Sequence, residues 1–215
     1  PHGMIASFMA RWNDSLPGCG GHIHHSLLHA KTGQPCFFNP KRPKEMTPVL
    51  RHFLAGQLHC LPDLLPMYAP NVNSYKRLVE GYWAPTTVTW GLDNRTVCCR
   101  VILNSAKSAR IECRVPGADI NPYLALAALL ASGLYGIEHK LALPAPISGN
   151  AYAQNAPRLA KNLSEATQRF AQSELARNLL GAEFVDHFAR TRVWEWRQFE
   201  RAVTDWELKR YFELA

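Results

Sequence analysis

Three charged residues alternate with apolar residues near the middle of the chain, and they would share one face of a β-strand. Arg110, Glu112 and Arg114 fall two positions apart, so their side chains point to one side of an extended chain. Ile111 and Cys113 then point to the other side. Such alternation is by itself typical of a solvent-facing antiparallel strand. A carboxylate between two guanidinium groups could also hold a metal ion beside anionic groups, so the accompanying residues decide between the two interpretations.

Histidines occur at a spacing that suits a metal ion. His22 and His24 would lie on one face of a strand and His25 on the other, so two imidazoles could point into one cleft. A His-x-His pair alone is often structural, because zinc or magnesium sites require several convergent ligands. Glu112 is the available carboxylate partner. Both a packed or solvated histidine pair and a metal site remain open.

Basic residues indicate anionic ligands. Arg100 interrupts an apolar run, and an arginine is rarely buried without an anion, so we expect a phosphate or a carboxylate near it. Lys107 lies in a predicted loop, where it would contact a phosphate or simply be solvated. Two further polar, basic segments accompany them, 73–77 and 93–95. Together these residues predict a site for a metal ion and several anionic groups.

The composition is that of an ordinary folded protein. The chain has 215 residues, of which 47% are hydrophobic and 19% charged, with a formal net charge of +7. This charge could suit nucleic acid, a membrane surface or an anionic small molecule. The basic residues are dispersed, without Lys/Arg-rich blocks or finger-type Cys and His pairs, so we expect no nucleic acid partner. No apolar run reaches membrane-spanning length, so we expect no membrane association.

The cysteines and the first residues bear on location and completeness. Six cysteines, at positions 19, 36, 60, 98, 99 and 113, lack Cys-x-x-Cys spacing and predict reduced thiols in a cytoplasmic protein. No signal peptide is recognisable. The chain enters a strand-like pattern without an initiating Met, so we expect a fragment whose amino-terminal part is absent.

Several segments are predicted to be strands. The first part, up to Leu28, alternates like two strands joined by a glycine-rich turn at 13–21, which predicts a hairpin with the histidines on its second strand. Three later segments rich in β-branched residues also predict strands: 86–90, 96–103 and 110–115.

Two helices are expected within the first 140 residues. Apolar residues recur at helical spacing up to about Leu61, and Thr47 is a possible amino-terminal cap. The prolines at 62, 66 and 70 are expected to break the chain into turns after this helix. Asn121 and Pro122 predict the start of a second helix, which is apolar all round and therefore expected to be central.

The last third of the chain is predicted to be helical. A loop rich in Pro, Ala and Asn spans 143–158, and helical patterns follow it to the end. Thr204 and Glu207 form a plausible capping box for the last helix.

Five motifs, in order and at matching spacing, resemble the catalytic domain of the glutamine synthetase family. They are GCGGHIHHSL at 18–27, NSYKRLV at 73–79, DNR at 93–95, RIECR at 110–114 and ADINPYLALAA at 118–128. The resemblance runs from the first residue to Glu207. It implies that residues 1–215 are the carboxyl-terminal portion of that domain, without its amino-terminal β-domain and first part. The implied fold is α+β, with a curved antiparallel sheet packed against helices and a helical carboxyl-terminal region.

The resemblance also implies an activity. Family members form γ-glutamyl phosphate from glutamate and ATP, and an amine then displaces phosphate to give glutamine or a substituted amide. The implied cofactor is Mg²⁺ or Mn²⁺, and the implied assembly is a homo-oligomeric ring with sites shared between subunits. A fragment without the upstream part is expected to be inactive alone. A catalytically inactive homologue with an assembly or regulatory role is the alternative, and a metal-dependent binding module or hydrolase built on the histidines is a third class.

The motifs carry implied roles for individual residues. The implied metal ligands are His22 and Glu112. The implied ATP-binding residues are His24, Ser26, Arg95, Arg100 and Lys107. The implied substrate-binding residues are Gly18, Arg77, Arg95, Arg114 and Trp83. The implied catalytic residues are Arg77, Arg95, which would lie between glutamate and the γ-phosphate, and Arg110, which would stabilise the transferring phosphoryl group.

Two departures from the family pattern concern substrate selection. Ammonia-using members carry Glu in a Gly-Tyr-Glu-Ala-Pro segment that helps accept the proton of ammonium, but this chain has Trp83 there. An indole cannot do that acid–base work, so we expect a larger amine such as methylamine, ethanolamine or a polyamine. Pro17 replaces the Asn that helps bind the glutamate amino group and leaves only the Gly18 backbone to match, so an acid other than glutamate is also open. Tyr152 falls near a tyrosine that is nucleotidylated in some members, but its surroundings match poorly and predict an ordinary loop tyrosine.

Overall fold

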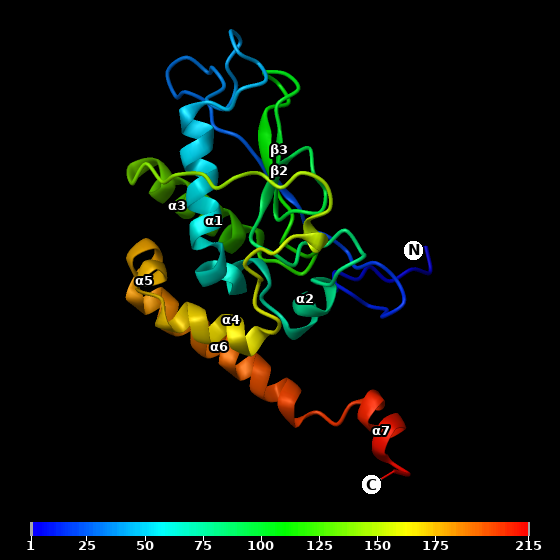
Figure 1. The fold of residues 1–215 in the computed structure, drawn as a ribbon. Coiled ribbons are helices and arrows are strands. Elements are labelled where there is room, and N and C mark those ends of the chain that lie inside the picture. Colours follow the sequence, from blue (N-terminus) through cyan, green and yellow to red (C-terminus); the bar gives the residue numbers. More distant parts are fainter. Residues whose placement is uncertain (1, 215) are drawn as a thin grey trace.

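A small sheet and a pair of crossing helices form the body of the structure, a computed structural model that describes residues 2–214 (Figure 1). The strands are β1 (Ile23–His25), β2 (Trp90–Leu92), β3 (Cys99–Ile102) and β4 (Arg110–Cys113). The helices are α1 (Pro48–Tyr68), α2 (Val72–Arg77), α3 (Pro122–Glu138), the 3₁₀ helix η1 (Ala151–Ala153), α4 (Leu163–Gln172), α5 (Glu174–Leu180), α6 (Ala182–Arg201) and α7 (Asp205–Tyr211). The α+β class expected from the sequence is confirmed.

The sheet has the strand order β1-β4-β3-β2. The pairs β1–β4 and β3–β4 are antiparallel, as expected, whereas β2 and β3 run parallel. The register aligns His24 with Glu112 and Glu112 with Arg100. Directly paired residues point to the same face of a sheet, so these three side chains form one row across three strands. The sheet thereby brings together residues that lie far apart in the sequence.

The amino-terminal hairpin predicted from the sequence is wrong. Among the residues that the structure describes before Leu28, only Ile23–His25 form a strand, and its partner is β4. The earlier segment makes its hydrogen bonds elsewhere: Arg11 N–H donates to the Asn73 side chain on α2 at 2.9 Å. Ile5 is 97% exposed, so the alternating apolar residues there do not mark a buried strand face.

Helix α1 begins as predicted and ends later. The Thr47 hydroxyl accepts a hydrogen bond from Leu50 N–H, which confirms the cap. The helix then continues through Pro62 and Pro66 to Tyr68, so the predicted break after Leu61 is wrong. An internal proline costs about 3 kcal/mol. The last two turns bury Leu64, Leu65, Met67 and Tyr68, and each such side chain contributes about 1.5–3 kcal/mol, which offsets that cost.

Helix α3 crosses α1 through glycines. Its start is confirmed, because the Asn121 side chain accepts hydrogen bonds from the first turn. The central position expected from its sequence is wrong, because α3 packs mainly against α1 on one face and leaves its outer face exposed. The outer face exposes four large apolar side chains, Tyr123, Leu126, Leu130 and Leu134.

We expect Gly56→Ala to lower the free energy of unfolding by about 3 kcal/mol, because a methyl group overpacks the helix crossing. A Cβ at Gly56 would lie 2.1 Å from the Ser132 carbonyl oxygen and 2.6 Å from Gly136 N. In an open helix the same change would stabilise by about 0.5–1 kcal/mol. The sign of the change in denaturant midpoint therefore tests the crossing, and an increase in stability would contradict it.

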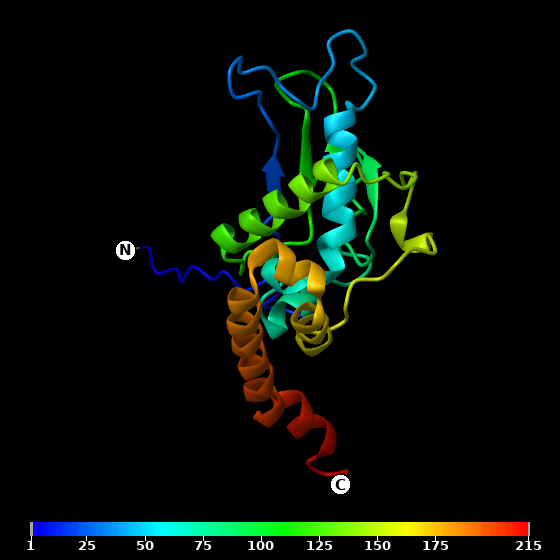
Figure 2. The ribbon, with the colours of Figure 1, turned by 90° about the vertical axis from the view of Figure 1, so that its left-hand side faces the viewer.

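Two of the three later strands are confirmed as shorter strands, and the strand predicted at 86–90 is wrong in position. Strands β3 and β4 lie within the predicted segments, whereas 86–89 forms only a bridge between Thr87 and Arg158 before β2 starts at Trp90. The last part is helical, and the Thr204–Glu207 capping box is confirmed. Figure 2 shows α6 running away from the body, with α7 at its far end. None of the helices described in residues 2–214 is both long and apolar enough to cross a membrane.

Candidate active site

Glu112 is the centre of a buried polar network. Its carboxylate is 3% exposed, so the interpretation of β4 as a solvent-facing strand is wrong. Oε1 accepts a hydrogen bond from Arg114 at 2.5 Å and lies 3.1 Å from His22 Nδ1, while Oε2 accepts one from Arg100 at 2.8 Å. The structure thus brings together four residues that the sequence had singled out at three separate places.

The contacts within this network determine the ionisation states of Glu112 and His22. Burial opposes ionisation of Glu112, but the Arg100 hydrogen bond and the Arg114 charge outweigh burial and hold its pKa below the usual range. Burial, with the charges of Arg114 and Arg77, lowers the pKa of His22 to about 4. Near neutral pH the carboxylate is therefore ionised and the imidazole neutral, which are the forms that bind metal ions.

His22 and Glu112 fit two ligands of one divalent ion. Adjacent ligands at about 2.1 Å from an octahedral ion lie roughly 3 Å apart, and the His22 Nδ1 to Glu112 Oε1 distance is 3.1 Å. Within residues 2–214 no group of three or more His, Cys, Asp or Glu side chains could hold a metal. An ion held here would need additional ligands beyond this pair.

Arg100 has two carboxylate partners from the protein itself. Its guanidinium donates to the carboxylate of Asp93 at 2.9 Å through Nε, and also through Nη2, besides its bond to Glu112. The anion that the sequence predicted beside Arg100 is therefore present as protein carboxylates. A phosphate contact at Arg100 stays a prediction.

Arg77 is a buried neighbour of His22 in the His22–Glu112 pair. It is 4% exposed and donates hydrogen bonds to the carbonyl groups of Val115 at 2.8 Å and Arg114 at 3.1 Å. Its Nη2 is 3.2 Å from His22 Nε2. Burial and the Arg114 charge lower the pKa of Arg77 to about 10, so it remains a cation near neutral pH. Gly18 packs on its stem, because a Cβ there would lie 2.9 Å from Arg77 Cγ.

Three predicted ATP-binding residues, together with Arg110, which is predicted to be catalytic, lie toward one end of the sheet. Arg110 Nε donates to His24 Nδ1 at 2.9 Å, next to the end of β1, where Ser26 follows. Lys107 lies in the turn between β3 and β4, and its side chain bonds to no other group among the described residues. Ser26 and Lys107 are exposed, so their contacts with a nucleotide stay predictions.

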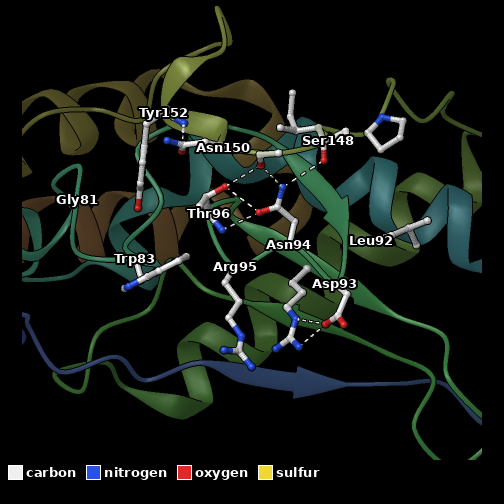
Figure 3. A pocket seen from close by; sticks show the side chains of 14 residues that line it. Gly81, Trp83, Leu92, Asp93, Asn94, Arg95, Thr96, Ser148, Asn150 and Tyr152 are labelled. Carbon is white, nitrogen blue, oxygen red and sulfur yellow. Dashed lines mark hydrogen bonds and ion pairs between the residues drawn. The ribbon is translucent and has the colours of Figure 1, made fainter.

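A pocket of about 940 Å³ opens beside this network. Among the side chains that line it are Trp83, Asn94, Arg95, Thr96, Arg100 and Tyr152. Figure 3 shows Trp83, Arg95 and Tyr152 around one side of it. Trp83 and Asp93 adopt left-handed backbone conformations, with φ of 58° and 48°. Such strain in residues other than glycine is uncommon and concentrates at functional sites.

Two loops that are distant in sequence form the pocket wall. Asn94 donates to the Gly149 carbonyl at 2.8 Å, and Thr96 Oγ1 accepts from Ala151 N–H at 2.9 Å. Sequence reasoning missed Thr96 and the wall residues at 146–150. In the sequence, Thr96 only adjoins the polar 93–95 motif. Residues 146–150 only fall within a predicted loop.

Comparison with known proteins identifies the class. The family model described as the glutamine synthetase catalytic domain matches residues 1–211. The chain belongs to the glutamine synthetase family.

Three similar proteins illustrate the range of the family. Type-1 glutamine synthetase 2 of Dictyostelium discoideum is 50% identical over 99% of this chain and 42% of the relative. Glutamate--isopropylamine ligase of a Pseudomonas species is 46% identical over 99% of this chain and 47% of the relative. A solved structure titled as a GmaS/ADP complex superposes with a TM-score of 0.84 and 32% identity, covering 96% of this chain and 49% of that one. The chain therefore spans less than half the length of these relatives.

Proposed function

We propose that the complete protein containing this chain is an ATP-dependent ligase that joins the γ-carboxylate of glutamate to an amine larger than ammonia. The observation that carries this proposal is Trp83, whose indole is 63% exposed and lines the pocket that also contains Arg95. The names of two similar proteins, a glutamine synthetase and a glutamate–isopropylamine ligase, support the reaction type.

In this proposal His22 and Glu112 hold Mg²⁺ or Mn²⁺ together with ligands from elsewhere in the protein. The bound ion would neutralise part of the charge of the ATP phosphates. The Arg100 and Arg114 side chains keep Glu112 ionised, and burial keeps His22 neutral. Because the chain offers only these two ligands within its described residues, we propose that it is inactive alone.

In the proposal, one set of residues binds ATP and a second, overlapping set binds glutamate. The ATP-binding residues in the proposal are His24, Ser26, Arg95, Arg100 and Lys107. The glutamate-binding residues are Gly18, Arg77, Arg95 and Arg114. Guanidinium groups already fixed by protein hydrogen bonds, such as Arg77 on the Val115 carbonyl, need little reorganisation when an anion binds.

The proposed reaction proceeds in two transfers. A γ-carboxylate oxygen of glutamate attacks the γ-phosphorus of ATP, and the bond to ADP breaks; Arg95 and Arg110 offset the charge of the transferring group. The neutral amine nitrogen then attacks the acyl carbon, the acyl C–O bond to phosphate breaks, and the proton that nitrogen loses leaves with the phosphate as HPO4²⁻. Arg77 holds the glutamate carboxylate in place for both transfers. Trp83 cannot accept the proton that the amine loses, but its apolar, electron-rich face favours an alkyl chain or a cationic group.

Assembly and location belong to the same proposal. Family membership leads us to propose a homo-oligomeric ring for the complete protein. A cytoplasmic location is supported by six free cysteines among the described residues.

Phosphate release from ATP by the complete protein, measured with glutamate and a panel of amines, tests the proposal. We expect kcat/KM with methylamine, ethanolamine or a polyamine to exceed that with ammonium at least about 10-fold, since pocket contacts discriminate on this scale. Omitting glutamate provides the control and should abolish release. Release with ammonium alone would instead define a glutamine synthetase, and silence with every amine would favour another acid substrate or the catalytically inactive homologue.

A further inference from the structure

The Trp83 segment is held by hydrogen bonds to its backbone rather than by burial of its indole. Trp83 has a φ of 58°, and the preceding Gly81 has a φ of 88°. A non-glycine residue in this conformation costs about 1–3 kcal/mol. The indole is 63% exposed, so its packing contributes little to offset that cost.

Two side chains bind successive carbonyl groups in this segment. Arg114 Nη2 donates to the Trp83 carbonyl at 3.1 Å, and the Tyr152 hydroxyl donates to the Ala84 carbonyl at 2.9 Å. Ala84 is itself buried, at 2% exposure, so its carbonyl group depends on such a donor. Figure 3 shows the Tyr152 hydroxyl directed toward the side on which Trp83 lies.

The turn that carries Tyr152 is itself bonded to the loop that carries Arg95. The Asn150 side chain accepts from Tyr152 N–H at 3.0 Å, and the neighbouring Ala151 N–H donates to Thr96 Oγ1 at 2.9 Å. Thr96 Oγ1 donates to Asn94 Oδ1 at 2.7 Å, next to Arg95. Hydrogen bonds thus fix the 150–152 turn to the Arg95 loop on one side and, through the Tyr152 side chain, to the backbone beside Trp83 on the other.

We propose that Tyr152 is a positioning residue for amine selection, which sets the place of the Trp83 indole through the Ala84 carbonyl. The inference rests on the proposed function, because it assigns the Trp83 side of the pocket to the amine. Partial burial raises the pKa of Tyr152, so its hydroxyl stays a donor near neutral pH. Arg114 holds the Trp83 carbonyl but also bonds Glu112, so Tyr152 is the residue whose role can be separated from the anion sites.

The test is Tyr152→Phe in the complete protein, with separate KM values for the amine, glutamate and ATP. Removing one neutral hydrogen bond should raise the amine KM about 3- to 10-fold, with the glutamate and ATP values unchanged. The preference for the larger amine over ammonium should fall with it. The matched control is Tyr211→Phe at the end of α7, which does not line the pocket and is 51% exposed, and it should change none of these values.

A double-variant cycle separates positioning from general stability. If Tyr152 acts through the indole, adding Trp83→Ala to Tyr152→Phe should raise the amine KM by less than the sum of the two single effects in free energy. Additive effects, an unchanged amine KM, or a common shift of all three KM values with a lower melting temperature would each overturn the inference. These outcomes can be measured only if the wild-type protein is active with at least one amine. A wild-type protein inactive with every amine would overturn the proposed function and this inference together.

Discussion

Glu112→Gln in the complete protein is expected to reduce the rate of phosphate release by about 10²- to 10³-fold, because it removes the only carboxylate that contacts His22 in the described residues. The amide keeps the size of the side chain but loses its charge. The proposed divalent ion would then be held more weakly, so the Mg²⁺ concentration for half-maximal rate should rise as well. Initial rates over a Mg²⁺ titration measure both effects.

The same change should lower stability, and this must be separated from the loss of rate. Glu112 is the buried counter-charge of Arg114 and one of two for Arg100. Breaking a buried ion pair from one side costs about 3 kcal/mol or more. Rates should therefore be taken well below the melting temperature of the variant. Glu45→Gln, which breaks only an exposed pair with Arg42, is the control and should leave the rate intact. Undiminished turnover by folded Glu112→Gln would remove the metal assignment.

Trp83→Glu is expected to shift the ratio of kcat/KM for ammonium over that for a larger amine by about 10²-fold toward ammonium. A carboxylate at this position would attract ammonium and accept its proton, whereas an indole cannot accept that proton. The backbone strain at φ 58° is already present and the side chain is exposed, so the change should cost little stability. Amine-dependent phosphate release with both amines measures the ratio.

Trp83→Gln is the matched comparison, because it changes size as Glu does but adds no charge. It should weaken the preference for the larger amine without improving the use of ammonium. Equal behaviour of the Glu and Gln variants would contradict a role for charge at this position. It would leave only the size of the side chain as the determinant.

Local chemistry in the sequence predicted where helices begin, and tertiary packing decided where they end. Thr47 and Asn121 cap their helices through side-chain oxygens, which a single residue type reveals. The prolines at 62 and 66 predicted an end to α1, but burial of the following turns overrides that local preference. The first segment alternated like a strand, yet its partner groups lie on α2, which no local pattern shows.

The grouping of side chains on neighbouring strands was predictable from the sequence, whereas the contacts between distant loops were not. The two-residue period correctly predicted that Arg110, Glu112 and Arg114 share the face of the strand that points away from the core. Glu112 contacts both His22 and Arg100, as expected for a carboxylate on that face. The parallel pairing of β2 with β3 and the approach of the 146–152 loop depend on contacts between distant segments. For this reason the Tyr152 contact with Ala84 had no counterpart in the sequence pattern.

The exposed pocket wall tolerates amino-acid substitutions better than the charged row of side chains on the sheet. The residues on either side of Glu112 on β4 are fully buried core residues, so a shift of that strand by one position would exchange core and site at once. Trp83 and the 146–150 loop, in contrast, are largely exposed. On the proposed function, substitutions in the loops would therefore change the amine substrate, while the strands keep the residues proposed to hold ATP and the metal ion.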